Sequence, residues 1–168
     1  MNYEESIEWL NTIPLSFDRN NNNYEFKLDG IKAFLSHLDN PHSKLKIIHV
    51  GGTNGKGSTC SIISSILQES GYKIGAFTSP HIKDYRERIR IGKNFIEKDF
   101  ISEFIRNNNL KIEELGLTYF EISFAMAIDY FATKKVDYTI LEVGLGGRLD
   151  ATNIVKPIIS VITNIGYD

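Results

Sequence analysis

The feature that most constrains the fold is a glycine-rich segment, residues 51–57, which lies between an apolar run and a helical pattern. Residues 47–50 predict a buried strand, and a helix is expected over residues 58–70. A strand, a glycine loop and a helix in this order place backbone N–H groups and the positive end of the helix dipole around an anion. Lys56 adds a full positive charge where a nucleotide triphosphate concentrates its own negative charge. The segment therefore predicts a P-loop-type α/β fold.

The loop departs from the strict phosphate-loop pattern, which places Ser or Thr directly after the lysine. Here the spacing from Gly51 to Gly55 is one residue short, and Gly57 follows Lys56, so that the hydroxyl comes at Ser58. A bound Mg²⁺ would then need a ligand from elsewhere in the chain. The residues alone leave open an ordinary strand–helix turn with a surface lysine.

Composition narrows the classes of protein to which the chain can belong. Its 168 residues are enough for one domain, and a net charge of −2 gives no overall basic surface for nucleic acid. No apolar run approaches about 18 residues, so no membrane partner is expected. The N-terminal residues Met-Asn-Tyr-Glu-Glu-Ser lack the features of a signal peptide, and the single Cys60 suits a reducing cytoplasm.

Strand and helix patterns alternate along the chain, which predicts a mostly parallel sheet with helices on both faces. A polar loop is expected at residues 18–23, between two lead-in helices. Arg86, Arg88 and Arg90 are interpreted as the solvated face of an extended segment rather than as an anion site. The helices are expected at 3–10, 28–38, 58–70, 100–105 and 119–132, and the strands at 47–50, 73–77, 137–143 and 158–162. The helix at 58–70 should bury an apolar stripe made of Ile62, Ile63, Ile66 and Leu67, and the helix at 100–105 should be closed by Asn107, Asn108 and Asn109. The strand at 158–162 is expected to be buried.

Ligands of open α/β sheets bind beyond the carboxyl ends of the strands. The segments that follow the predicted strands are residues 51–58, 78–81, 142–153 and 163–168. We therefore expect these segments to converge on one site.

Several side chains in these segments have the chemistry of a phosphate and metal site. Glu142 ends an apolar strand, where a carboxylate can help to hold Mg²⁺, and Ser79 can supply the hydroxyl that is missing after Lys56. His81 either orients a phosphate or caps a turn. Arg148 either pairs with Asp150 at the surface or binds an anionic substrate.

Four motifs, taken in order along the chain, resemble motifs of the folylpolyglutamate synthases and dihydrofolate synthases, which are ATP-dependent amide ligases of the Mur ligase group. The first is His-Val-Gly-Gly-Thr-Asn-Gly-Lys-Gly-Ser-Thr at 49–59, and the second is Thr-Ser-Pro-His at 78–81 with Arg-Glu-Arg-Ile at 86–89. Leu-Thr-Tyr-Phe-Glu at 117–121 and the long motif at 141–153 complete the set.

The resemblance implies two cofactors, ATP and Mg²⁺. Ser79 and Glu142 would bind the Mg²⁺, and Lys56 would act in catalysis on the terminal phosphates. The residues that would surround the ATP phosphates are Thr53, Asn54, Gly55, Lys56, Gly57 and Ser58.

The resemblance also implies the substrates, which are folate or dihydropteroate together with L-glutamate. Thr118, Tyr119 and Phe120 would line the pteridine pocket, and Arg148 would lie near the same substrate. In this family ATP phosphorylates a substrate carboxylate, and the amine of glutamate then attacks the acyl phosphate to form an amide. Lys56 and Mg²⁺ would offset charge on the transferred phosphoryl group.

By the same resemblance, residues 1–168 form the N-terminal portion of a Mur-ligase-like ATP-binding domain, with a helical lead-in at 1–45 and a P-loop α/β core at 46–168. The family continues with a metal-binding His and a C-terminal glutamate-binding domain, which are absent here. The sheet would therefore be truncated, and we expect an isolated chain that cannot ligate and that self-associates through an exposed sheet edge.

Two other classes of protein compete with this interpretation. One is a stand-alone, non-catalytic ATP-binding module. The other is a P-loop kinase or GTPase, which is disfavoured because the chain has no Asn-Lys-x-Asp motif and no hydroxyl directly after Lys56.

Overall fold

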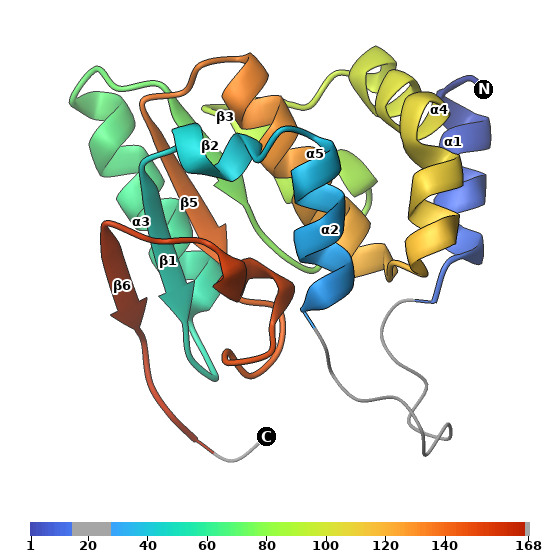
Figure 1. Ribbon diagram of the computed structural model, residues 1–168. Coiled ribbons are helices and arrows are strands. Elements are labelled where there is room, and N and C mark those ends of the chain that lie inside the picture. Colours follow the sequence, from blue (N-terminus) through green and yellow to red (C-terminus); the bar gives the residue numbers. More distant parts are fainter. Residues whose placement is uncertain (15–27, 167–168) are drawn as a thin grey trace.

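The computed structural model describes residues 1–14 and 28–166, so the polar loop predicted at 18–23 lies outside the described residues. The chain forms a six-stranded sheet in the order β4-β3-β2-β5-β1-β6 (Figure 1). Strands β2, β5, β1 and β6 are parallel, whereas β3 and β4 add an antiparallel edge. The prediction of a mostly parallel α/β sheet is confirmed.

The regular elements follow one another in the order that the sequence patterns predict, with several short additions. The helices and strands are α1 (Tyr3–Thr12), α2 (Asp29–His37), η1 (Pro41–Lys44), β1 (Ile47–Gly51), α3 (Lys56–Glu69), β2 (Ile74–Phe77), η2 (Tyr85–Arg88), β3 (Ile89–Ile91), β4 (Asn94–Phe95), α4 (Lys98–Leu115), α5 (Tyr119–Thr133), β5 (Tyr138–Glu142), η3 (Ala151–Ile154) and β6 (Ile159–Ile162).

Helices cover both faces of the sheet, as predicted (Figure 1). Successive side chains of a strand point to opposite faces, so Ile47 joins the large apolar core around α5 while Ile48 joins a smaller core around α3. Gly75 in β2 lets α5 pack closely, because a Cβ at this position would lie 2.7 Å from the ring of Phe131. Helices α1 and α4 pack outside α2 and α5.

The predicted end of α4 is wrong. The three asparagines at 107–109 do not close the helix, which continues to Leu115 and ends at Gly116 in a left-handed conformation with φ 60°. The buried Asn108 amide donates to the Phe104 carbonyl, one turn earlier, at 2.8 Å. Because the Asn108 side chain finds its partner within the helix, it does not draw the backbone into a turn that would end the helix.

The arginine segment also differs from the prediction. Residues 85–88 form the short helix η2, and only Arg90 lies on a strand. Asp84 caps η2 by accepting the backbone N–H of Arg86 at 3.0 Å. Arg88 is buried, so the three arginines do not share a solvated face.

Helix α3 begins at Lys56, two residues earlier than predicted. Its predicted apolar stripe is only half buried. Ile63 and Leu67 pack on the smaller core, whereas Ile62 and Ile66 are exposed.

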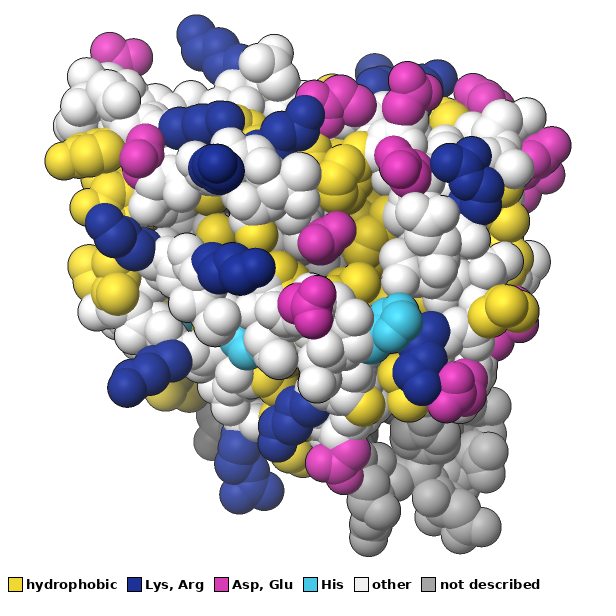
Figure 2. Space-filling view, turned by 45° about the horizontal axis from the view of Figure 1, so that its top comes forward, with side chains coloured by type: hydrophobic (Ala, Val, Ile, Leu, Met, Phe, Trp, Pro, Cys, Tyr) yellow, Lys and Arg dark blue, Asp and Glu magenta, His cyan; other side chains and the backbone are white. Residues whose placement is uncertain are grey.

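Strand β6 forms where predicted but is not buried. It pairs only with β1 at the edge of the sheet, and the side chains of Ile159 and Ile162 are 52% and 69% exposed. None of the described helices is both long and apolar enough to span a membrane. Figure 2 shows that basic and acidic side chains are interspersed over one face of the molecule.

Candidate functional site

The glycine loop is fixed to the segment that follows β6. The backbone N–H of Thr53 donates to the Asn164 carbonyl at 2.9 Å, and the N–H of Asn54 donates to Asn164 Oδ1 at 2.8 Å. Thr163 Oγ1 donates to the Asn54 carbonyl at 2.7 Å. The sequence pointed to the segment 163–168 but not to these two residues, which hold the first half of the loop in place.

The second half of the loop carries the free donors. Within the described part of the chain, the backbone N–H groups of Lys56, Gly57 and Ser58 have no hydrogen-bond partner, as is usual in the first turn of a helix. Gly55 precedes them in a left-handed conformation with φ 79°. The geometry is that of an anion site at a helix N-terminus.

The amine of Lys56 folds back over the loop. Its Nζ donates to the carbonyls of Gly52 at 2.7 Å and Thr53 at 3.2 Å. Because Lys56 is only partly buried, its charge remains available to an anion that enters the site.

Glu142 meets the loop at the first turn of α3, as predicted. An ideal Cβ on Gly57 would lie 3.5 Å from Glu142 Oε1, and the backbone N–H of Ser79 donates to Glu142 Oε2 at 2.8 Å. The Glu142 side chain is buried, and burial raises its pKa, although the bond from Ser79 and the charge of Lys56 act in the opposite direction. The tips of β1, β2 and β5 therefore bring together a cation, a carboxylate and a serine.

The arrangement fits a Mg²⁺ ion that is shared with a phosphate. Among the described residues, Glu142 Oε1 accepts no hydrogen bond, so this oxygen is available to a cation. Over the same residues there is no group of three or more His, Cys, Asp or Glu side chains that could hold a metal alone. One carboxylate with one hydroxyl leaves the other positions to water and phosphate oxygens, which is the usual environment of Mg²⁺.

A cavity of about 510 Å³ lies beside the loop, and Arg148 is exposed at its wall. Three of the four predicted segments line it, and the fourth joins through the bond between Ser79 and Glu142. The predicted convergence at the carboxyl edge is therefore confirmed. The lining residues are His49, Gly51, Gly52, Thr53, Lys56, Val143, Gly144, Leu145, Gly146, Gly147, Arg148, Asn153, Ser160, Val161, Ile162, Asn164 and Ile165.

Arg148 does not pair with Asp150 in the described structure. The carboxylate of Asp150 instead accepts the backbone N–H groups of Gly144 and Leu145, both at 3.0 Å, and two bonds from Thr152. Asp150 thus organises the turn from inside, and Arg148 is left on the cavity wall.

The three residues predicted for the pteridine pocket point in different directions. Thr118 caps α5, and its hydroxyl donates to Glu121 Oε2 at 2.8 Å. Tyr119 lines a smaller cavity of about 320 Å³ that His81 also borders. Phe120 packs against Phe77, with ring centroids 5.6 Å apart.

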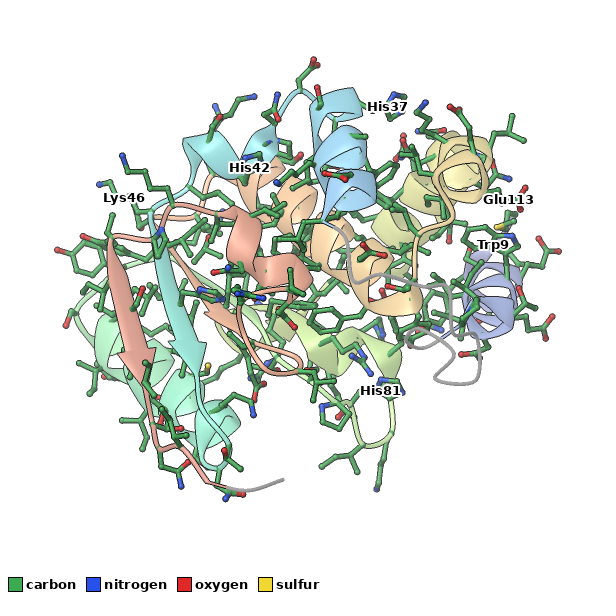
Figure 3. The ribbon with its side chains drawn as sticks, turned by 60° about the horizontal axis from the view of Figure 1, so that its bottom comes forward. Trp9, His37, His42, Lys46, His81 and Glu113 are labelled. Atoms are coloured by element: carbon green, nitrogen blue, oxygen red, sulfur yellow. The ribbon has the colours of Figure 1, made fainter. Side chains whose placement is uncertain are left out.

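His81 is held by an arginine rather than by a turn. Its Nδ1 accepts a hydrogen bond from Arg88 Nε at 2.8 Å, and the guanidinium group lies 5.2 Å from the centre of the Tyr119 ring. Burial and the Arg88 charge lower the pKa of His81, which favours the neutral imidazole. Figure 3 shows His81 at the end of the molecule opposite Lys46.

Comparisons with known proteins agree with this geometry. Residues 50–168 match the family described as Mur ligase middle domain. The dihydrofolate synthase/folylpolyglutamate synthase of Bacillus subtilis (strain 168) is 43% identical over 148 residues, which are 84% of the chain and 34% of that relative.

Two solved structures are similar over the whole chain. A folylpolyglutamate synthase complex with AMPPCP and folate superposes with a TM-score of 0.89 at 33% identity, covering 100% of the chain and 41% of that protein. A bifunctional folylpolyglutamate synthase/dihydrofolate synthase with Mn, AMPPNP and L-glutamate bound gives a TM-score of 0.87 at 35% identity, covering 100% and 39%. The chain therefore spans 34–41% of the length of these relatives.

Proposed function

Because the chain belongs to the Mur ligase middle-domain family, we propose that it is the nucleotide-binding part of an ATP-dependent ligase that joins L-glutamate to the carboxylate of folate or dihydropteroate. The observation that carries this proposal is the meeting of the Glu142 carboxylate with the first turn of α3, next to Lys56, which lines the cavity. The ligands named for the similar structures, which are ATP analogues, folate, Mn and glutamate, support the same assignment.

In the proposed reaction, ATP lies with its phosphates on residues 53–58. The free N–H groups of Lys56, Gly57 and Ser58 donate to phosphate oxygens, and the Lys56 amine leaves the loop carbonyls for the terminal phosphates. These contacts orient the terminal phosphoryl group toward the substrate carboxylate and offset the charge that develops during transfer.

Glu142 and Ser79 are the proposed ligands of Mg²⁺. The Glu142 carboxylate faces the first turn of α3, and the Ser79 side chain replaces the hydroxyl that Gly57 cannot supply. When bound, Mg²⁺ neutralises phosphate charge and holds the phosphate oxygens in place.

The substrate carboxylate needs activation, because it is a poor acyl donor. We propose that phosphoryl transfer converts it to an acyl phosphate, and that the amine of glutamate displaces the phosphate to form the amide. Thr118, Tyr119, Phe120 and Arg148 are proposed on the substrate side. Of these, Arg148 lies on the wall of the nucleotide cavity and has the charge to bind an anionic group.

The isolated chain is proposed to bind nucleotide but not to complete ligation, since residues 1–168 would be the lead-in (1–45) and core (46–168) of the ATP-binding domain and span only 34–41% of the length of these relatives. The cytoplasm is the proposed location.

The exposed edge of β6 is proposed to drive self-association. Sedimentation velocity should then show a dimer or larger species that Ile162→Lys converts to monomer, and a monomeric parent chain would refute self-association.

Calorimetric titration of the chain with Mg-AMPPNP tests the nucleotide site. Lys56→Met is expected to abolish the binding heat, whereas the matched control Lys156→Met, an exposed lysine before β6, should bind like the parent. Glu142→Gln keeps an acceptor for the Ser79 N–H but should remove the dependence on Mg²⁺. Equal heats for the parent and Lys56→Met would refute the proposed site.

A non-catalytic ATP-binding module would give the same titration. A ligase assay with folate, glutamate and Mg-ATP on the full open reading frame separates the two, because the ligase proposal predicts amide formation and the module predicts none.

A further inference from the structure

A buried hydrogen-bond chain connects the strand before the phosphate loop to the glycine turn after β5. His49 in β1 lies with its Nε2 2.7 Å from Thr152 Oγ1, and both side chains are buried. Thr152 Oγ1 in turn donates to Asp150 Oδ1 at 2.5 Å. The other carboxylate oxygen, Asp150 Oδ2, accepts the N–H groups of Gly144 and Leu145 at 3.0 Å.

The direction of each bond follows from counting protons. The Asp150 carboxylate can only accept, so the single hydroxyl proton of Thr152 must point to it. The oxygen of Thr152 then accepts from His49, which requires a proton on His49 Nε2. Burial lowers the pKa of His49, although the Asp150 charge acts in the opposite direction, and this favours the neutral imidazole with the lone pair on Nδ1.

The glycine turn is held mainly by hydrogen bonds, and besides those to the Asp150 carboxylate, Asn153 Nδ2 donates to the Arg148 carbonyl and the Asp150 N–H to the Gly147 carbonyl, both at 3.0 Å. Leu145 and Leu149 are 60% and 43% exposed, and Gly146 has a left-handed φ of 68° with nothing within 4 Å of where a Cβ would lie. Only Gly144 packs closely, because a Cβ at this position would lie 2.6 Å from the ring of Phe120. Hydrogen bonds rather than apolar burial therefore fix the turn, and the Asp150 carboxylate accepts the two bonds at its start.

We propose that His49 is a positioning residue, which acts through Thr152 and Asp150 to fix the turn 144–148 against the nucleotide cavity. His49, the turn and the phosphate loop all line this cavity, so the position of the turn sets its shape. If His49 does not donate to Thr152 Oγ1, the hydroxyl can rotate away from Asp150. Asp150 Oδ1 then keeps only the backbone N–H of Thr152, at 3.0 Å, and the acceptor of the two turn N–H groups is held less firmly. The effect on ligand binding rests on the proposed function, whereas the effect on the turn does not.

Two pairs of substitutions test the proposal, one at His49 and one at Thr152, and in each pair one variant keeps the hydrogen bond and the other removes it. The amide nitrogen of Gln can take the place of His49 Nε2, whereas Asn is too short to reach. Ser keeps the Thr152 hydroxyl, and Val keeps its shape but removes the bond. Thr139→Val is the matched control, because Thr139 is equally buried and its Oγ1 has no hydrogen-bond partner in the described structure.

Amide hydrogen exchange of the ligand-free chain is the first readout. Exchange at Gly144 and Leu145 should rise about three- to tenfold in Thr152→Val and His49→Asn, which is the loss expected for one hydrogen bond. Thr152→Ser, His49→Gln and Thr139→Val should exchange like the parent. Nitrogen-15 NMR should find the His49 proton on Nε2.

Titration with Mg-AMPPNP is the second readout. Thr152→Val should bind more weakly by a similar factor, with Thr152→Ser restoring the parent affinity. If the parent does not bind the nucleotide, the proposed function fails while the exchange test still stands. Unchanged exchange at both amides in Thr152→Val and His49→Asn, or a His49 proton on Nδ1, would overturn the proposal.

Discussion

Gly52 is the residue at which a single methyl group should do most damage to the phosphate loop. Its φ is +129°, and a Cβ there would overlap Thr163 Oγ1 and lie 2.8 Å from the Asn164 carbonyl oxygen. The same two residues accept or donate the bonds that hold the loop. Gly52→Ala therefore strains the backbone and pushes the loop away from the residues that fix it.

The expected cost is the sum of two effects. A non-glycine residue in a sparsely populated backbone region costs about 1–3 kcal/mol, and overpacking against a neighbour that cannot move freely costs about 1–3 kcal/mol more. Gly52→Ala should thus lower the free energy of unfolding by about 2–6 kcal/mol, a large part of the total for a domain of this size.

Gly55→Ala is the matched control in the same loop. Gly55 also has a positive φ, +79°, but nothing lies within 4 Å of the Cβ position. Only the left-handed backbone cost of about 1–2 kcal/mol applies there. Urea unfolding followed by tryptophan fluorescence and circular dichroism gives both values, and Gly52→Ala should lose more stability by about 2 kcal/mol.

Two results would refute this reasoning. Equal losses in the two variants would mean that the close approach to Thr163 and Asn164 carries no energy. A Gly52→Ala chain as stable as the parent would mean that the loop does not hold the observed backbone conformation in solution.

Three further predictions concern stability in the metal-free chain. Because burial raises the pKa of Glu142, the folded chain binds the carboxyl proton more tightly than the unfolded chain does. The free energy of unfolding should therefore fall as pH rises from about 4.5 through the raised pKa. In urea unfolding at pH 5 and pH 8, Glu142→Gln should remove the Glu142 contribution to this fall. Thr118→Ala removes the cap of α5 and should cost about 1 kcal/mol, whereas Thr118→Ser should keep most of it. Gly75→Ala forces a methyl group against the Phe131 ring and should lower the unfolding free energy by about 1–3 kcal/mol. A loss below about 0.5 kcal/mol would contradict the capping argument in Thr118→Ala and the packing argument in Gly75→Ala.

The sequence was sufficient to predict the sheet, its helices and the meeting of Lys56 with Glu142, because each rests on a local pattern and on the geometry of parallel strands. The antiparallel β4 was missed, since two residues carry too little pattern. The length of α4 was misjudged because Asn108 bonds to its own helix, a contact that the sequence does not reveal. The exposure of β6 depends on what packs beside it, and its isoleucines alone resemble a buried strand.

The contacts of several site residues were also not predictable from the sequence. Asp150 looked like a partner for Arg148, two positions away, but its carboxylate is occupied by Thr152 and by two backbone N–H groups of the turn. The residues that hold the phosphate loop, Thr163 and Asn164, lie 110 positions or so from it and meet it only because β6 is paired with β1. Long-range pairing of this kind follows from topology, which local patterns do not specify.

The two halves of the loop therefore differ in what a ligand must do to them. The N–H groups of Thr53 and Asn54 are already bonded to Asn164, so this half is preorganised and need not rearrange for a ligand. The N–H groups at the start of α3 are free, but the Lys56 amine must first give up the carbonyls of Gly52 and Thr53. On the proposed function, nucleotide binding would exchange these two neutral acceptors for charged phosphate oxygens, and bonds to charged acceptors are the stronger ones. Affinity would then depend on a loop that is held rigidly by the segment after β6 and that adjusts at the Lys56 side chain.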